Sequence, residues 1–279
     1  MEDKIGMKYS GLMSVYKKED PQLFEKALTS IINQTMPPAQ MVLIEDGKLT
    51  TELLDIVEKM QVRFEKNKIF FKIIRNEKNL GLGLSLKKGV ESCSYSWIAR
   101  FDSDDISVNY RMEESINYVC KNPNVKLLGS YIAEIEKDTN KVLDVRKVPK
   151  GNVEIKRIMG KRNPFNHMTV FFERETILKA GNYKDVPYFE DYYLWLRVLS
   201  RDIEAANIGK VLVKATVDAN FLNKRGGAQY LKKEFNFQSI IYKEKYISFP
   251  VFVFNILTRG MVRIFPKRAL KYVYKIIRK

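Results

Sequence analysis

The chain has 279 residues, of which 45% are hydrophobic, and it carries a formal net charge of +16 at pH 7. This length accommodates one substantial hydrophobic core, and the composition excludes a disordered chain. With two cysteines and the single histidine His167, neither a disulfide framework nor an imidazole-rich metal centre is expected. The N-terminus has no secretory pattern, so we expect a cytoplasmic protein.

The positive charge is concentrated at the C-terminal end. Residues 221–279 contain 14 Lys or Arg and 2 Glu, a net charge of +12, which leaves +4 for residues 1–220. We therefore divide the chain into a domain at 1–220 and a basic, helical C-terminal extension at 221–279. A basic extension suits RNA, DNA or an anionic membrane surface, so charge alone does not choose among them.

Short apolar runs alternate with helical patterns between residues 9 and 105. The patterns predict strands at 9–16, 41–44, 69–74 and 95–101, and helices at 21–34, 51–64 and 82–91. Asp20 is expected to cap the first helix and Pro21 to occupy its first position. Strands that alternate with helices imply right-handed crossovers, so we predict an α/β fold with a mainly parallel sheet covered on both faces.

The second half of the chain gives weaker signals. We predict a helix at 106–121, strands at 125–135 and 142–148, and a polar loop at 162–167 that leads into a strand at 168–172. A further helix opens at Glu190-Asp191, and its apolar stripe includes Trp195, which we expect in the core. Carboxylates at the start of a helix are favoured by the helix dipole, so capping alone also explains this pair.

Three carboxylates, Asp102, Asp104 and Asp105, follow directly after the apolar run at 95–99. Such a cluster repels itself unless a positive group lies beside it, and hard oxygen ligands suit Mg²⁺ or Mn²⁺ bound to a nucleotide diphosphate. The alternative is a solvated acidic turn in which Ser103 and Asp104 cap the next helix. In parallel sheets, ligands bind at the carboxyl ends of the strands. Because Tyr16 and Asp46 also follow strands, we expect all these side chains at one sheet edge.

Together these motifs resemble the inverting family 2 glycosyltransferases with a GT-A, Rossmann-like nucleotide-sugar-binding fold. The resemblance is to the bacterial members that build capsular, exopolysaccharide or lipopolysaccharide chains, and it spans about residues 8–230. It is carried by the segments 13–16, 34–35, 44–47, 79–81 and 99–105, by Arg111, and by the segments 190–191 and 225–227.

The resemblance implies a role for each motif residue. Tyr16 and Asp46 would contact the nucleoside of a nucleotide sugar such as a UDP-sugar, and Asp102 would lie near the ribose and the sugar. Asp104 would bind Mn²⁺ or Mg²⁺ with Asp105 beside it. Arg225 and Arg100 would stabilise the negative charge of the departing diphosphate. Asp191 would be the general base, with Glu190 as the alternative.

Several features depart from the family pattern or suggest other sites. The family often has Pro before the arginine that follows its acidic motif, and the segment 109–111 lacks it, so the acceptor-side loop is expected to differ. The segment 79–83 suggests a dinucleotide fingerprint but lacks the third glycine, so we do not expect an NAD site. His167 either binds the diphosphate or the acceptor, or is a structural residue.

Two other functions remain open from the sequence. A sugar-phosphate nucleotidyltransferase also uses an acidic metal site, but it would have a glycine-rich loop after its first strand, and residues 16–20 contain no glycine. A nucleic-acid-binding module would use the basic extension and would have no use for Asp104. We expect a nucleotide-sugar donor, a saccharide or lipid-linked saccharide acceptor, and no nucleic acid.

The C-terminal extension has two features relevant to membranes. Residues 249–257 are apolar but far shorter than the ~20 residues that a membrane-spanning helix needs. Residues 266–279 place apolar and basic side chains on opposite faces, as in a helix that lies on anionic lipid headgroups. This pattern predicts peripheral association with the inner face of the cell membrane, whereas a basic face packed against its own domain is the alternative.

Overall fold

A computed structural model describes residues 6–137, 139–217 and 228–264 of the protein. The first half alternates strands with helices, as predicted: β1 (Ser10–Val15), α1 (Pro21–Ile32), β2 (Gln40–Glu45), α2 (Thr51–Lys66), β3 (Phe70–Arg75), α3 (Leu82–Ser92) and β4 (Trp97–Arg100). Asp20 caps α1 by accepting hydrogen bonds from the backbone N–H groups of Gln22 and Leu23, which confirms that prediction.

The second half begins with β5 (Ile106–Ser107), α4 (Arg111–Lys121), β6 (Val125–Glu136), β7 (Val142–Arg146) and α5 (Asn152–Ile158). A 3-10 turn, η1 (His167–Thr169), precedes β8 (Phe171–Glu173), α6 (Arg174–Lys179), α7 (Glu190–Leu199) and β9 (Glu204–Val217). Two more helices follow, α9 (Ala228–Lys243) and α10 (Phe249–Ile264). In the parts of the chain with assigned structure, no helix is both long enough and apolar enough to span a membrane.

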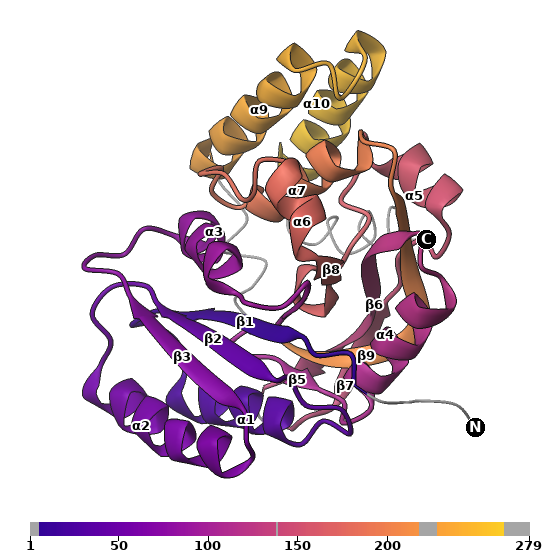
Figure 1. The fold of residues 1–279 in the computed structure, drawn as a ribbon. Helices are drawn as coiled ribbons and strands as arrows, with labels where there is room; N and C mark the ends of the chain where they lie inside the picture. Colours follow the sequence, from indigo (N-terminus) through magenta and orange to yellow (C-terminus); the bar gives the residue numbers. More distant parts are fainter. Residues whose placement is uncertain (1–5, 138, 218–227, 265–279) are drawn as a thin grey trace.

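One mixed sheet joins these strands in the order β3-β2-β1-β4-β8-β6-β9-β5, with β7 on β6 (Figure 1). Strands β3, β2, β1 and β4 run parallel, whereas β8 is antiparallel to both β4 and β6. The chain moves outward from β1 to β3 and then returns to the other side of β1 as β4. The carboxyl ends of β1 and β4 therefore form a topological switch point, where parallel sheets bind ligands.

Two sequence predictions about secondary structure are wrong. The helix expected at 106–121 begins only at Arg111, because Ile106 and Ser107 pair with Lys214 and Val213 of β9. The strand expected at 168–172 begins at Phe171, because residues 167–169 form the 3-10 turn η1. In the first case a partner distant in the sequence decides the local structure, and local periodicity does not report such a partner. In the second case a local turn delays the start of the strand.

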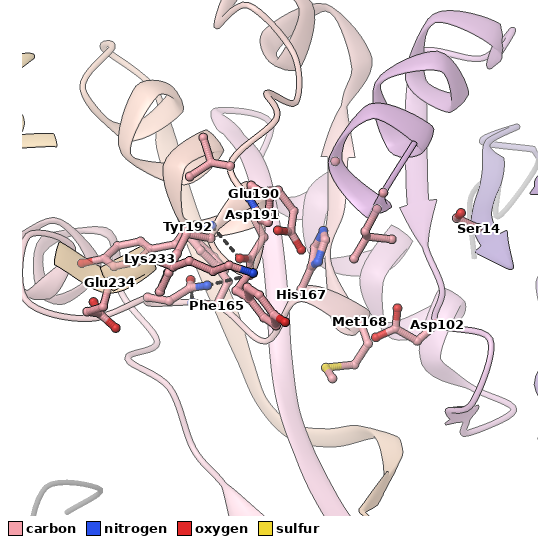
Figure 2. A pocket seen from close by; sticks show the side chains of 18 of the residues that line it. Ser14, Asp102, Phe165, His167, Met168, Glu190, Asp191, Tyr192, Lys233 and Glu234 are labelled. Carbon is pink, nitrogen blue, oxygen red and sulfur yellow. Dashed lines mark hydrogen bonds between the residues drawn. The ribbon is translucent and has the colours of Figure 1, made fainter. Parts of the chain in front are cut away.

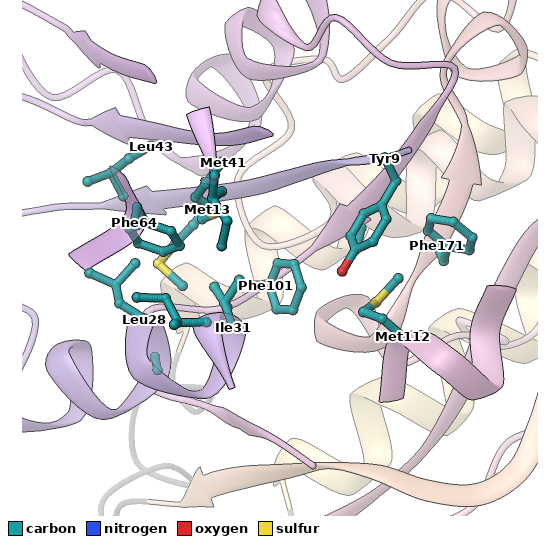
Figure 3. Close-up of a cluster of buried hydrophobic side chains, with 14 of the residues drawn as sticks. Tyr9, Met13, Leu28, Ile31, Met41, Leu43, Phe64, Phe101, Met112 and Phe171 are labelled. Atoms are coloured by element: carbon teal, nitrogen blue, oxygen red, sulfur yellow. The ribbon is translucent and has the colours of Figure 1, made fainter. Parts of the chain in front are cut away.

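The sheet buries apolar side chains on both faces, because successive residues of a strand point to opposite sides. One face packs Met13, Met41 and Phe101 against α1, α2 and α4 (Figure 3). The other face packs Leu12 and Val42 against α3, α6 and α7. Trp195 of α7 is fully buried there, which confirms its predicted place in the core.

Helices α9 and α10 pack against α7 through an aromatic cluster. Phe237 of α9 stacks on Phe189 with ring centroids 4.5 Å apart and also contacts Tyr192. Arg225, the residues on both sides of the predicted boundary at 220/221 and the predicted amphipathic helix at 266–279 lie outside the described residues. The division of the chain into two units and the membrane-binding helix therefore stay predictions.

Gly83, near the start of α3, allows that helix to pack closely against the segment before α7. A Cβ atom at Gly83 would lie 2.7 Å from the backbone oxygen of Lys184 and 3.1 Å from the Cβ of Glu190. Although Ala favours helices over Gly, we expect Gly83→Ala to lower the free energy of unfolding by about 1–3 kcal/mol, because it forces the α3 end away from the loop before α7. Urea denaturation measures this difference.

Gly151→Ala is the matched control, because a Cβ atom there meets no heavy atom within 4 Å. Equal stability of the two variants would contradict the close packing of α3 against the 184–190 segment.

Candidate active site

A cavity of about 980 Å³ opens at the carboxyl ends of β1 and β4. The strand ends contribute Ser14, Tyr16, Arg100, Asp102 and Asp104. Side chains from the loop before α7, from α7 itself and from α9 and α10 complete the lining. The structure therefore brings most of the predicted site residues to one cavity, namely Tyr16, Asp46, Arg100, Asp102, Asp104, Glu190 and Asp191.

The acidic cluster after β4 is compact. Carboxylate oxygens of Asp102, Asp104 and Asp105 lie within 4.8 Å of one another, which is a spacing that suits a shared divalent cation. Asp105 is buried and does not line the cavity, and its Oδ1 accepts a hydrogen bond from the backbone N–H of Thr216 at 3.1 Å. Burial, together with the charges of Asp102 and Asp104, raises the pKa of Asp105 well above its usual range. Asp102 and Asp104 are thus the members of the cluster that line the cavity, while Asp105 fastens it to β9.

Two arginines support the cluster from inside the protein. Arg100 is 2% exposed and forms an ion pair with Asp102. Arg111, which was noted only as part of a motif, donates to the backbone oxygen of Arg100 at 2.7 Å and lies over the ring of Phe101. Arg111 therefore holds the backbone from which the acidic residues project, and its own side chain is buried.

Asp46 has its carboxylate occupied by hydrogen bonds. One oxygen accepts from the backbone N–H of Leu80 at 2.7 Å and from Asn76, and the other accepts from the N–H of Gly81 at 3.0 Å. Gly47 and Gly81 both have positive φ angles, which allow the two turns to meet at this carboxylate. Asp46 thus fixes the turn before α3 beside Tyr16. Its predicted contact with a base edge stays a prediction.

Glu190 and Asp191 form the first turn of α7, and both line the cavity. Asp191 accepts hydrogen bonds from Nδ2 of Asn163 at 2.6 Å and from the backbone N–H of Tyr192 at 2.7 Å (Figure 2). Burial raises the pKa of Asp191 above its usual value, and burial together with the charge of Asp191 raises the pKa of Glu190 to about 7. The sequence analysis did not identify Asn163, although it lies in the polar loop noted at 162–167.

His167 lies in the cavity wall between the acidic cluster and the Glu190-Asp191 pair (Figure 2). Its Nε2 is 2.8 Å from the hydroxyl of Tyr183, and its ring packs edge-on against Trp195. Burial and the charge of Arg100 lower the pKa of His167 well below its usual value, which keeps the ring neutral. The structural and the functional interpretations of His167 are both compatible with this position.

The sequence analysis missed one wall of the cavity. This wall comprises Lys161 and Arg162 together with side chains of α9 and α10, namely Tyr230, Lys233, Glu234, Phe254, Thr258 and Arg259. Its members are spread over about a hundred positions of the chain, and no short motif joins them. The high density of basic residues in the C-terminal extension was the only available signal.

Known proteins resemble this chain in sequence and in fold. The model of the family described as "Glycosyl transferase family 2" matches residues 10–181. The UDP-Gal:alpha-D-GlcNAc-diphosphoundecaprenol beta-1,3-galactosyltransferase of Escherichia coli is 35% identical over 96% of this chain and 95% of its own length. The amylovoran biosynthesis glycosyltransferase AmsE of Erwinia amylovora is 34% identical over 97% and 99%, respectively.

A solved structure also matches the fold. The mannosyltransferase PcManGT of Pyrobaculum calidifontis, in complex with GDP-Man and Mn²⁺, superposes with a TM-score of 0.64 and 11% sequence identity. The match covers 96% of this chain and 73% of that chain. The Rossmann-like GT-A fold predicted from the motifs is therefore confirmed, and with the family match and the similarity to full-length relatives it shows that this chain belongs to glycosyl transferase family 2.

Proposed function

We propose that the protein is a metal-dependent, inverting glycosyltransferase that moves a sugar from a nucleotide sugar, in the simplest case a UDP-sugar, to a lipid-linked or growing bacterial surface polysaccharide. One observation carries the proposal. Asp104 at the end of β4 and Asp191 at the start of α7 line the same cavity, although nearly ninety residues separate them in the sequence.

The acidic end of the cavity suits the donor. Asp104 and Asp102 offer hard oxygen ligands that fit Mg²⁺ or Mn²⁺, and such an ion would stabilise the negative charge that develops on a departing diphosphate. The name of the PcManGT complex includes Mn²⁺, which supports this choice of metal. Tyr16 lines the same end and is suitably placed for a nucleoside.

Asp191 is our candidate for the general base. It would take the proton of an acceptor hydroxyl while the hydroxyl oxygen forms a bond to the anomeric carbon of the donor. The bond between that carbon and the diphosphate oxygen breaks at the same time, and its electron pair leaves with the diphosphate. A single displacement of this kind inverts the anomeric centre, so an α-linked donor gives a β-glycoside. Asn163 and the N–H of Tyr192 orient the carboxylate of Asp191 for this role.

The names of two relatives support the acceptor and the cellular location that we propose. The name of the E. coli relative specifies a UDP-Gal donor and a diphosphoundecaprenol-linked acceptor, and that of the E. amylovora relative specifies amylovoran biosynthesis. A lipid-linked acceptor would bring the protein to the inner face of the cell membrane. A nucleotidyltransferase is less well supported, because the family match covers residues 10–181 and the turn after β1 contains no glycine.

Substitution of Asp104 and of Asp191 separates donor binding from transfer. We expect Asp104→Ala to abolish the metal-dependent binding of UDP, because it removes a ligand of the ion. Asp191→Ala is expected to retain that binding but to lower kcat by about 10²–10⁴-fold, because the acceptor hydroxyl loses its base. Calorimetric titration of UDP with Mn²⁺ and a transfer assay with a panel of UDP-sugars measure the two effects.

Asp55→Ala on the outer surface of α2 serves as the control and should change neither quantity. Unchanged UDP binding by Asp104→Ala, or full transfer activity of Asp191→Ala, would rule out these roles.

The pH dependence of transfer tests the base independently. Asp191 must be ionised to accept a proton, and burial raises its pKa, so kcat/KM should be lost as the pH falls through this raised pKa. Glu190, with a pKa of about 7, adds a second ionisation near neutrality. We expect kcat/KM to be about threefold to tenfold higher at pH 8 than at pH 6. A flat profile between pH 5 and pH 8 would contradict the assignment.

The variant Glu190→Gln tests the ionisation of the Glu190-Asp191 pair through the free energy of unfolding. The folded state holds the Glu190 proton up to a pKa of about 7, whereas the unfolded chain releases it near the ordinary glutamate pKa of 4.5. The free energy of unfolding therefore falls as the pH rises through this window. We expect Glu190→Gln to be more stable than the unsubstituted protein by about 1–3 kcal/mol at pH 8, with much less gain at pH 5. Urea denaturation at both pH values measures this, and an equal gain at both would refute it.

A further inference from the structure

The wall of the cavity opposite the acidic cluster is basic. Of the residues that line it, Lys161, Arg162, Lys233 and Arg259 are cationic, and we call these four side chains the basic wall. The only carboxylate that α9 and α10 add to the lining is Glu234, which forms an ion pair with Arg259. The basic wall therefore carries excess positive charge where it faces the cavity.

Two ammonium groups of the basic wall lie over aromatic rings. The Nζ of Lys233 is 4.4 Å from the ring centroid of Tyr188, and the Nζ of Lys161 is 5.6 Å from that of Phe254. Within residues 6–137, 139–217 and 228–264, no carboxylate forms an ion pair with either lysine. Cation–π contacts hold a lysine in place without cancelling its charge, so both remain available to an anionic ligand.

Tyr188, which positions Lys233, adopts a backbone conformation that is costly for its residue type. Its φ angle is 76°, in the left-handed region that bulky residues rarely occupy, and its side chain is more than half exposed. Such strain persists only where surrounding contacts impose it, and it is concentrated at functional sites. In this conformation the Tyr188 ring contacts Lys233 and also Tyr230, whose ring centroid is 5.3 Å from that of Tyr188.

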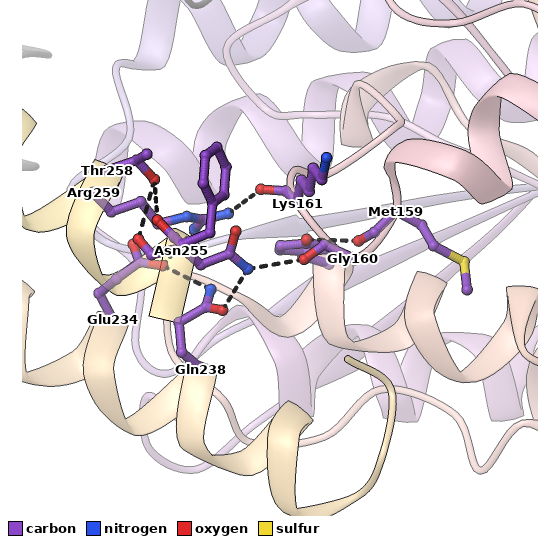
Figure 4. Close-up of polar contacts among 10 residues, drawn as sticks. Met159, Gly160, Lys161, Glu234, Gln238, Asn255, Thr258 and Arg259 are labelled. Atoms are coloured by element: carbon purple, nitrogen blue, oxygen red, sulfur yellow. Dashed lines mark hydrogen bonds and ion pairs between the residues drawn. The ribbon is translucent and has the colours of Figure 1, made fainter. Parts of the chain in front are cut away.

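Hydrogen bonds tie the basic wall into the fold. Asn255 of α10 donates to the backbone oxygen of Gly160 at 2.9 Å and to Gln238 of α9 at 2.9 Å (Figure 4). Arg259 also donates to the backbone oxygen of Lys161 at 2.8 Å. Both helices and the 159–161 segment are thereby fixed in one arrangement.

The general base lies between the basic wall and the donor end. In Figure 2, Asp102 and Ser14 lie on one side of the Glu190-Asp191 pair, whereas Lys233 and Glu234 lie on the other. An acceptor sugar with its hydroxyl at Asp191 would therefore direct its far side toward the basic wall. The donor diphosphate belongs at the acidic end with the metal ion, so a second anionic group is needed to explain the basic wall.

We infer that the basic wall binds the diphosphate of an alkyl-diphosphate-linked acceptor, with Lys161 and Lys233 as the principal contacts. This inference rests on the proposed function, because it assigns the acceptor side of the same cavity. The apolar surface beside the wall fits the alkyl chain: Phe254 lines the cavity and is 51% exposed, and Leu257, one helical turn further along α10, is 57% exposed.

The test uses farnesyl diphosphate as a probe, titrated into the full chain with UDP saturating and Mg²⁺ in excess. Saturating UDP occupies the donor end, so the remaining binding reports a second diphosphate site. We expect the double variant Lys161→Ala/Lys233→Ala to weaken binding of farnesyl diphosphate by about tenfold or more, because it removes two charge-assisted contacts. Lys161→Arg/Lys233→Arg should retain most of the binding.

Arg157→Ala/Lys232→Ala is the matched control. It removes the same amount of charge from α5 and α9, from two exposed residues that do not line the cavity. We expect it to bind farnesyl diphosphate as the unsubstituted protein does. If the control loses as much affinity as the wall variant, the effect is general electrostatics and the inference is wrong.

Two further measurements distinguish an acceptor diphosphate from the donor diphosphate, and an alkyl diphosphate from free pyrophosphate. The affinity for UDP with Mn²⁺ should be unchanged in the wall variant, and an equal loss would assign the lysines to the donor site. Leu257→Ala should weaken binding of farnesyl diphosphate and leave binding of inorganic pyrophosphate unaffected, because Leu257 is an exposed apolar residue. Equal effects on both ligands would argue against an alkyl chain. If the unsubstituted protein binds UDP with the metal ion but does not bind farnesyl diphosphate, this inference alone is overturned, whereas absence of UDP binding would overturn the proposed function.

Discussion

The buried positive charge of Arg100 is the interaction on which the rest of the site depends. The cavity brings together the carboxylates that follow β4 and those at the start of α7. Without a positive charge beside them, partly buried carboxylates this close together would raise one another's pKa and become protonated. Arg100 pairs directly with Asp102, and its charge opposes the rise in the pKa of Asp105 and of Glu190. Burial lowers the pKa of His167 well below its usual value, and the charge of Arg100 adds to this effect. One guanidinium therefore offsets the negative charge of both carboxylate groups, the cluster after β4 and the Glu190-Asp191 pair, in a single cavity.

The parallel half of the fold could be predicted from the sequence because its signals are local. Each strand from β1 to β4 is a short apolar run, and each helix between them has its own periodicity and cap, as Asp20 illustrates. The mixed half could not be predicted in this way. Ile106 and Ser107 form a strand only because β9 lies beside them, a hundred residues later in the chain. Long-range pairing of this kind overrides local preference.

The candidate site likewise contains residues that the sequence predicts and residues that it does not. Asp102 and Asp104 could be predicted because strand ends are readable in the sequence, and topology brings such ends to one edge. Asp191 could be predicted only from the family resemblance, because capping alone explains a carboxylate at a helix start. The hydrogen-bond partners of these carboxylates could not be predicted from the sequence. Asn163 reaches Asp191 through a loop, and Asp105 turns away from the cavity to the backbone of Thr216. Contacts made by loop geometry leave no periodic pattern, so only the structure identifies them.

The segment 159–163 connects the C-terminal helices to Asp191. The backbone oxygen of Met159 accepts the hydroxyl of Tyr192, that of Gly160 accepts Asn255, and that of Lys161 accepts Arg259. Two residues later, Asn163 donates to Asp191. Because so short a segment cannot shift at one end without moving the other, α9 and α10 set the orientation of Asp191 as well as the basic wall. The helices are therefore part of the architecture of the candidate site, although no motif of the family lies within them.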